Sequence, residues 1–192
     1  MREIQTHYPE RLTIIEGDAS KIQQEKYFTK PVKVVANLPY NIGTKLLIEW
    51  LTTENWPPFW HSLTLMFQSE VAERIAAMPG EKSYGRLSVL SNWRCSTSIK
   101  MKLNPEVFYP SPKVISAVVQ IEALKSPRYD TSLSNLEKVV AAAFNQRRKM
   151  LRSSLKSLTP DVERILTDLK LDPTARAESL TIEEFCLLAN HI

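Results

Sequence analysis

The stretch Val34-Val35-Ala36-Asn37-Leu38-Pro39-Tyr40-Asn41-Ile42 joins a short apolar run to an amide, a proline and an aromatic ring. Consecutive β-branched and small apolar residues are typical of a buried strand. Proline fixes its own φ and has no backbone N–H, so Pro39 ends the strand and makes the following turn rigid. The sequence therefore predicts that Asn37 and Tyr40 lie at the carboxyl end of a strand.

This turn carries hydrogen-bond acceptors that suit an aromatic amine such as N6 of adenine. Such an amine is a poor nucleophile, because its lone pair is delocalised into the ring. If the Asn37 side-chain oxygen and the Leu38 carbonyl each accept one N–H, the lone pair is localised and turns towards an electrophile. Pro39 offers no competing N–H, and the Tyr40 ring offers a flipped base a stacking face. An ordinary strand followed by an Asn-x-Pro turn gives the same pattern, so the tetrapeptide alone leaves both interpretations open.

Strands and helices alternate through the first two thirds of the chain, which predicts an α/β fold. In the last predicted strand, Ile115, Ala117, Val119 and Ile121 alternate with Ser116, Val118 and Gln120. We expect this strand and the one before it to close the edge of an otherwise parallel sheet as an antiparallel pair. The predicted strands are residues 12–16, 32–36, 63–67, 98–103 and 115–121, and the predicted helices are residues 43–52, 69–78 and 87–93.

The composition changes after residue 125. The segment 126–130 is a predicted linker, and only helical signals follow it. Ser134 is the expected cap of one helix, and Thr159-Pro160-Asp161 has the cap, proline and acid expected at the start of another. Thr181 and Glu184 form a predicted capping box at a third helix. A helical domain is therefore expected over residues 131–192.

Four motifs occur in the order found in one protein family: Asn37-Leu38-Pro39-Tyr40, Tyr84 to Val89, Phe108 to Val114, and Ala143 to Lys149. On these motifs the chain resembles the ribosomal RNA adenine N6,N6-dimethyltransferases, in particular the bacterial 16S enzymes whose loss gives kasugamycin resistance. The likeness runs from about Arg11 to the C-terminus. It implies a partial, incomplete Rossmann-like class I methyltransferase sheet over residues 1–125, followed by a small all-α RNA-docking domain over residues 131–192.

The resemblance also implies a cofactor, S-adenosylmethionine. In this family Asp18 would accept the amine of the cofactor's adenine, the Ala19 backbone would support that ring, and Asn37 would lie near both cofactor and target. Asp18 follows a predicted strand, at the strand end where sheet-based nucleotide binders hold their ligands. Its position after Gly17 is equally that of a simple turn residue.

A second wall for the target base is implied at Phe108, which precedes the proline-rich segment 109–112. So many prolines exclude a strand and predict a stiff loop. The resemblance implies that a target adenine is held between Phe108 and Tyr40. The alternative is that Phe108 anchors the strand that follows.

The densest basic cluster comprises Arg147, Arg148, Lys149, Arg152 and Lys156, with no acid among them. On one continuous helix, three of these cations would share a face opposite Leu151, Leu155 and Leu158. This pattern predicts phosphate binding, although a solvated helix face is the usual explanation. Arg74 and Arg86 are expected to extend the surface. Ser69 departs from the family, in which a basic residue is usual, so one phosphate contact is expected to be missing.

Composition adds few constraints. A net charge of +4 and a pI near 9.0 suit an anionic partner without requiring one. No apolar run approaches the roughly 20 residues of a membrane-spanning helix, and the first residues lack the apolar core of a signal peptide, so we expect a cytoplasmic protein. The two cysteines are far apart and not at metal-ligand spacing, so neither a metal site nor a disulfide is predicted.

No G-x-G-x-x-G pattern exists among the four glycines. The resemblance places the glycine-rich cofactor turn and two strands before residue 1, so we expect a fragment, a misplaced start, or a chain that pairs its exposed strand with another molecule. The leading hypothesis is an adenine dimethyltransferase acting on 16S rRNA in the small ribosomal subunit. The rival is a non-catalytic ribosome-binding factor that keeps the RNA surface, and a DNA adenine methylase is a weaker third interpretation.

Overall fold

The computed structural model describes residues 1–192, which divide into two compact units, residues 1–30 and residues 31–192. The first unit contains helix α1 (Arg2–His7) and the 3-10 helix η1 (Gln24–Tyr27). The predicted strand at residues 12–16 is wrong, because these residues pair with no strand of the sheet. Apolar periodicity marks a segment suited to a strand, but hydrogen bonds to a neighbouring strand are what make it one.

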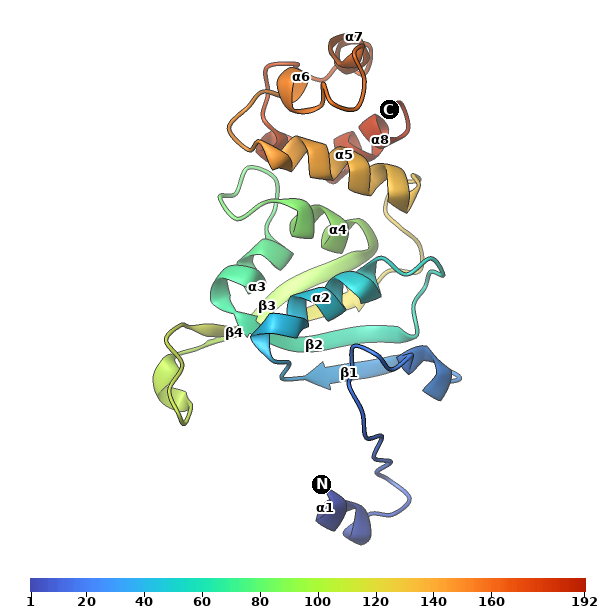
Figure 1. Ribbon diagram of the computed structural model, residues 1–192, viewed down its shortest axis with the longest axis vertical. Helices are drawn as coiled ribbons and strands as arrows, with labels where there is room; N and C mark the ends of the chain where they lie inside the picture. The colour runs from blue at the N-terminus through green and yellow to red at the C-terminus, as the bar shows by residue number, and fades with distance from the viewer. The chain divides into compact units, whose positions relative to one another are not determined.

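The second unit is built on a four-stranded sheet of order β1-β2-β4-β3 (Figure 1). Strand β1 runs parallel to β2, whereas β4 is antiparallel to both β2 and β3. The predicted antiparallel pair at one edge of a parallel sheet is therefore confirmed. The strands are β1 (Val32–Ala36), β2 (Trp60–Gln68), β3 (Cys95–Leu103) and β4 (Ser116–Ala123).

Alternating residues of β2 and β4 bury one face of this sheet. Leu63, Leu65 and Phe67 are paired with Ile121, Val119 and Ala117 across the ladder, and all six are at most 2% exposed. The predicted alternation in β4 is thus confirmed over residues 117–121. Ile115 is an exception, because it precedes the strand and is 43% exposed.

Helix α2 (Tyr40–Leu51) follows β1, α3 (Ser69–Ala76) follows β2, and α4 (Arg86–Arg94) follows α3 and precedes β3. Helix α2 begins three residues before its predicted start. Pro39 is its N-cap, and the Pro39 carbonyl accepts the N–H groups of Ile42 and Gly43 at 3.1 and 3.0 Å. Buried residues of α2 and α3 join β2 and β4 in one hydrophobic cluster.

A second hydrophobic cluster is formed chiefly by the C-terminal helices, which Figure 1 shows together at one end of this unit. Segments around α4 contribute Tyr84, Val89 and Trp93 to it. The predicted division at residues 126–130 stays a prediction. The helices are α5 (Leu133–Asn145), α6 (Leu151–Ser154), α7 (Val162–Asp168) and α8 (Ile182–Ala189), with 3-10 helices η2 (Pro105–Val107) and η3 (Ala177–Ser179).

Of the three helix caps that the sequence predicts, the structure confirms one. The Thr181–Glu184 capping box of α8 is confirmed. Helix α5 is capped by Ser132, whose hydroxyl accepts the Asn135 N–H, so the expected cap at Ser134 is wrong by two residues. Helix α7 starts after Asp161, which makes no side-chain capping bond. Both serines near α5 satisfy the same chemical preference, and only the backbone geometry selects between them.

None of the helices combines the length and the apolar character needed to cross a membrane. The two thiols are buried in different hydrophobic clusters, Cys95 at the start of β3 and Cys186 in α8. Burial raises the pKa of each thiol to about 12. Because the thiolate is the reactive form, both side chains serve as small apolar core residues near neutral pH.

Candidate functional site

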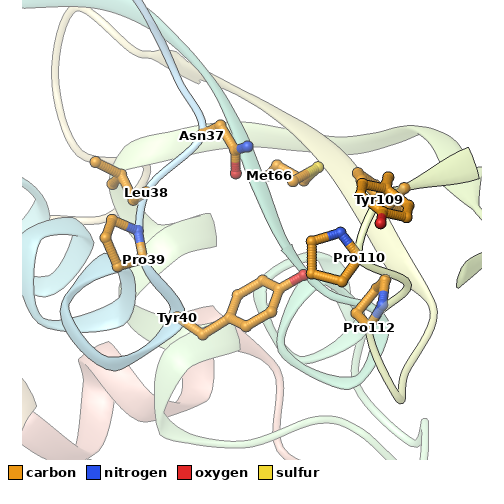
Figure 2. Close-up of a pocket in the computed structure, with 9 residues that line it drawn as sticks. Asn37, Leu38, Pro39, Tyr40, Met66, Tyr109, Pro110 and Pro112 are labelled. Carbon is orange, nitrogen blue, oxygen red and sulfur yellow. The ribbon is translucent and has the colours of Figure 1, made fainter.

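A pocket of about 350 Å³ lies where β1 ends and α2 begins (Figure 2). It joins the Asn37–Tyr40 turn to a residue of β2 and to the proline-rich loop between β3 and β4. The sequence predicted the turn and Phe108 as parts of one site, and the structure brings them together. The lining residues are Asn37, Leu38, Pro39, Tyr40, Met66, Phe108, Tyr109, Pro110 and Pro112.

Close packing at the start of α2 positions this turn. Gly43 lies in the first turn of the helix, where an added Cβ would stand 3.2 Å from the Phe67 ring and 3.3 Å from the Leu38 Cβ. Glycine therefore lets α2 approach both β2 and the turn more closely than a larger residue would. The Asn37–Leu38 backbone is held between the end of a strand and the start of a helix.

The two predicted acceptors of this turn are free to bind a ligand. Asn37 is exposed, and its amide makes no hydrogen bond within the protein. The Leu38 carbonyl accepts no backbone hydrogen bond, because the first N–H groups of α2 bind the Pro39 carbonyl instead. Figure 2 shows Asn37, Tyr40 and Pro110 around the same open space. The site thus has two oxygen acceptors and an aromatic ring, which are the groups suited to binding the amine of a stacked base.

The Tyr40 side chain is linked by a hydrogen bond to a strand that is distant in the sequence. Its hydroxyl lies 2.8 Å from the Ser116 hydroxyl, 76 residues away in sequence. Ser116 is the first residue of β4 and is fully buried. One end of the Tyr40 side chain is therefore held by α2 and the other by β4, which restricts the ring to one orientation against the pocket.

The opposite wall comes from the loop of residues 104–115. Its 3-10 helix η2 and a hydrogen bond from the Ser111 hydroxyl to the Pro105 carbonyl at 2.9 Å close the loop on itself. Phe108 is half-buried and faces the pocket region, whereas Tyr109 is fully exposed. The stiff loop predicted from its prolines is consistent with these contacts, and the stacking role of Phe108 stays a prediction.

Asp18 and Ala19 belong to the first unit, where both take part in a turn. The Asp18 carboxylate accepts the Ser20 hydroxyl at 2.7 Å and the Ser20 N–H at 3.0 Å. These hydrogen bonds, with a contribution from Lys21, lower the pKa of Asp18. The Ala19 carbonyl accepts the Gln24 amide. The alternative in which Asp18 is a turn residue therefore describes its local structure, and its cofactor contact stays a prediction.

The basic cluster does not form the predicted helix. Residues 146–149 are a turn, and α6 covers only residues 151–154. Leu151 and Leu155 are nevertheless fully buried, as the expected apolar face requires. A single continuous helix was the wrong inference, because apolar residues four apart are also buried by a short helix that continues as a turn.

Acidic partners divide the basic residues into two groups. Arg74, Arg147 and Arg152 pair with Glu70, Glu178 and Glu163 at 3.6, 3.1 and 3.3 Å. Arg147 also donates to the Lys82 carbonyl. The second group is exposed and forms no salt bridge, and it consists of Arg86, Arg148, Lys149 and Lys156.

We expected Arg74 and Arg86 to extend the basic cluster, and they lie near only one of its members, Arg147. Arg74, Arg86 and Arg147 line one pocket of about 440 Å³, together with Glu137 of α5. The remaining members of the cluster do not line it. Because three acids pair with or accompany these arginines, this pocket carries little net charge.

Sequence reasoning gave no role to Met66 and Ser116, which both belong to the site. Ala36 pairs with Leu65, so the next residues of the two strands, Asn37 and Met66, are neighbours. Strand pairing is the signal that would have found Met66, and it is a tertiary property. Nothing local distinguishes Ser116 from the other serines of the chain.

The chain matches the family described as ribosomal RNA adenine dimethylase over residues 2–192. It is 55% identical over 192 residues to the ribosomal RNA small subunit methyltransferase A of Dinoroseobacter shibae, covering all of this chain and 69% of that protein. The protein of the same name from Paracoccus denitrificans is 58% identical over 189 residues, which cover 98% of this chain and 67% of that protein.

Two solved structures share the fold. A dimethyladenosine transferase from Plasmodium falciparum aligns with a TM-score of 0.77 at 24% identity, over 97% of this chain and 74% of that one. The 23S rRNA methyltransferase ErmE aligns with a TM-score of 0.70 at 22% identity, over 98% and 75%. These likenesses confirm the predicted fold class, an α/β methyltransferase sheet followed by helices.

Proposed function

The chain belongs to the ribosomal RNA adenine dimethylase family, and on that premise we propose that it methylates N6 of adenine in the 16S rRNA of the small ribosomal subunit. S-adenosylmethionine is the proposed methyl donor, and the cytoplasm is the proposed location. The observation that carries the proposal is the pocket at the end of β1, where two unengaged acceptors stand beside the Tyr40 ring. A flipped adenine stacked on that ring would present its amine to both acceptors.

The chemistry would require the N6 lone pair to attack a methyl carbon bound to sulfur. The carbon–sulfur bond would break with its electron pair left on sulfur, and the amine would then lose a proton to solvent. The Asn37 oxygen and the Leu38 carbonyl would accept the two N–H groups and stabilise the positive charge that develops on nitrogen. S-adenosylmethionine supplies the electrophilic methyl group. Asp18, whose lowered pKa keeps it ionised, has the acceptor chemistry that the amine of the cofactor's adenine needs. Asp18 and Ala19 are the cofactor-binding residues that we propose in the first unit, and Asn37 is the one that we propose in the second.

Methyl transfer from isotopically labelled S-adenosylmethionine to unmethylated small ribosomal subunits tests the proposal. We expect N6,N6-dimethyladenosine in a nuclease digest of the 16S rRNA, identified by mass spectrometry. The assay should be run on this chain and on a version extended upstream through any in-frame glycine-rich segment. Subunit binding without cofactor binding or methyl transfer in either form would favour the non-catalytic ribosome factor, and methylation of naked duplex DNA would favour the DNA methylase.

Replacing either aromatic wall of the pocket is expected to weaken capture of the flipped base. Tyr40→Ala and Phe108→Ala should each cost about 1–3 kcal/mol, because that is the usual contribution of a base stacked on a ring. The readout is KM for the RNA substrate, with the affinity for S-adenosylmethionine as a control that should barely change. Loss of the cooperative thermal transition in either variant would instead identify that ring as a core anchor.

Loss of the Tyr40–Ser116 hydrogen bond is expected to weaken capture of the base, because this bond orients the Tyr40 ring. Ser116→Ala and Tyr40→Phe should each weaken base capture by about 0.5–1.5 kcal/mol, the usual contribution of a single hydrogen bond. The double variant should lose no more than either single one, because each change removes the same bond. Additive losses in KM would show that Ser116 affects the pocket by some other route.

We further propose that residues 131–192 dock on RNA, with the unpaired cations as the main phosphate contacts. Replacing Arg148, Lys149 and Lys156 by alanine should flatten the log–log dependence of subunit binding on salt by about 0.7–0.9 units per lost contact. The matched control is Arg147→Ala with Arg152→Ala, since both already bind a carboxylate. This control should change the slope less. Equal slopes in the triple variant and the wild type would leave these residues as a solvated surface.

A further inference from the structure

Tyr109 is an aromatic ring in contact with almost nothing in its own chain. It is 102% exposed, more than any other large hydrophobic residue of the protein. Tyr109 is nevertheless one of the residues that line the Asn37–Tyr40 pocket. Figure 1 shows its loop extending away from the sheet between β3 and β4. An aromatic side chain left in water forgoes the free energy that burial would give it, so its position favours a partner that covers it.

The loop that carries Tyr109 has a restricted backbone, which limits where the ring can lie. Pro110 follows the ring directly, Pro112 lies two residues further on, and the Ser111 hydroxyl binds the Pro105 carbonyl at 2.9 Å. Prolines restrict the backbone of the loop and of the residues before them. The ring therefore belongs to a stiff segment, so binding of a ligand to it loses little conformational entropy in the loop.

The backbone at Phe108 explains why the two neighbouring rings differ. Phe108 has extended dihedral angles, with φ −114° and ψ 151°. Successive side chains of an extended backbone point to opposite sides. Both residues line the pocket, but Phe108 is half-buried there whereas the Tyr109 side chain is exposed to solvent. Two consecutive residues thus offer one ring to the inside of the pocket and one to its rim.

We propose that Tyr109 stacks on the nucleobase adjacent to the target adenine in the same RNA strand. The proposal rests on the function proposed above, in which the target base occupies the pocket. When one base leaves the stack, its neighbour loses a stacking partner and exposes a face near the pocket mouth. The Tyr109 ring is placed to cover that face, and exposed Lys113 on the same loop can meet the strand's phosphates. Tyr109 would then be a positioning residue that holds the flipped conformation open.

A nucleobase is a suitable partner for this ring. Aromatic rings bind bases through their faces without requiring a particular base. The expected contribution is therefore an increase in affinity for any single-stranded neighbour, with little sequence preference. A protein partner is the alternative occupant, and the experiment separates the two.

The test uses fluorescence of 2-aminopurine placed in the RNA that the protein methylates, at the target position or at either adjacent position. Binding by the wild type should quench the probe at one adjacent position. Tyr109→Ala should remove that quenching and weaken binding roughly 5- to 150-fold. Tyr109→Phe should restore both. The response of the probe at the target position should change little, because that base contacts Tyr40 and Phe108.

Val107→Ala is the matched control, since Val107 is 65% exposed in the same loop but does not line the pocket. It should leave affinity and quenching unchanged. If Tyr109→Ala methylates and binds RNA like the wild type, with unchanged quenching, the stacking proposal is overturned and a protein partner becomes the better occupant. Failure of the proposed function is a different result, because the wild type itself would then transfer no methyl groups.

Discussion

Asn37→Ala is expected to lower the single-turnover rate of methyl transfer by about 100-fold or more, with RNA binding within a few fold of the wild type. The side-chain oxygen is placed where charge develops on the attacking nitrogen, and one preorganised group of this kind is commonly worth about 2.7–4 kcal/mol. Asn37 is exposed and makes no hydrogen bond to other residues, so its removal should not disturb the fold.

The single-turnover rate should be measured with saturating RNA and labelled S-adenosylmethionine, in whichever form of the protein is active. Asn37→Asp keeps an acceptor oxygen in the same place and should retain more activity than Asn37→Ala. Both variants should unfold at the temperature of the wild type. A rate for Asn37→Ala within a few fold of the wild type would eliminate the proposed role, and the Leu38 carbonyl alone would have to orient the amine.

Phe185→Ala is expected to lower the free energy of unfolding by about 3–5 kcal/mol. Phe185 of α8 is fully buried, and its ring centroid lies 5.6 Å from that of Phe144. Phe144 in turn meets the Tyr84 ring edge to face at 6.0 Å. The three rings join α8, α5 and the segment before α4, so removal of the Phe185 ring leaves a cavity beside Phe144.

Denaturant unfolding of the wild type and variant gives this value from the shift in midpoint at constant slope. Leu187→Ala is a matched control on the same helix, because its side chain is 40% exposed. It should change stability by at most about 0.5 kcal/mol. Similar losses in the two variants would mean that the aromatic cluster contributes no more than the surface of α8. Loss of docking in Phe185→Ala at temperatures where it stays folded would link this cluster to the RNA surface.

The sequence correctly predicted those elements whose stabilising contacts lie within a short segment. The Thr181–Glu184 box closes within four residues, and the alternation in β4 follows from the period of two in any strand. The Asn37–Tyr40 turn could also be predicted, because proline fixes its own φ and has no backbone N–H to donate to a strand. The α/β fold class and the position of the Asn37–Tyr40 turn were therefore determined by the sequence alone.

Only tertiary structure decided the features that depend on distant partners. Residues 12–16 have strand-like composition without a neighbouring strand, and Arg147 has a glutamate 31 residues away that no basic pattern reveals. Met66 reaches the pocket through the register of β1 and β2, and Ser116 holds Tyr40 across 76 residues. Hydrogen bonds and salt bridges form between groups that folding brings together, so their partners are specified by the packing of the whole chain rather than by any short segment of it.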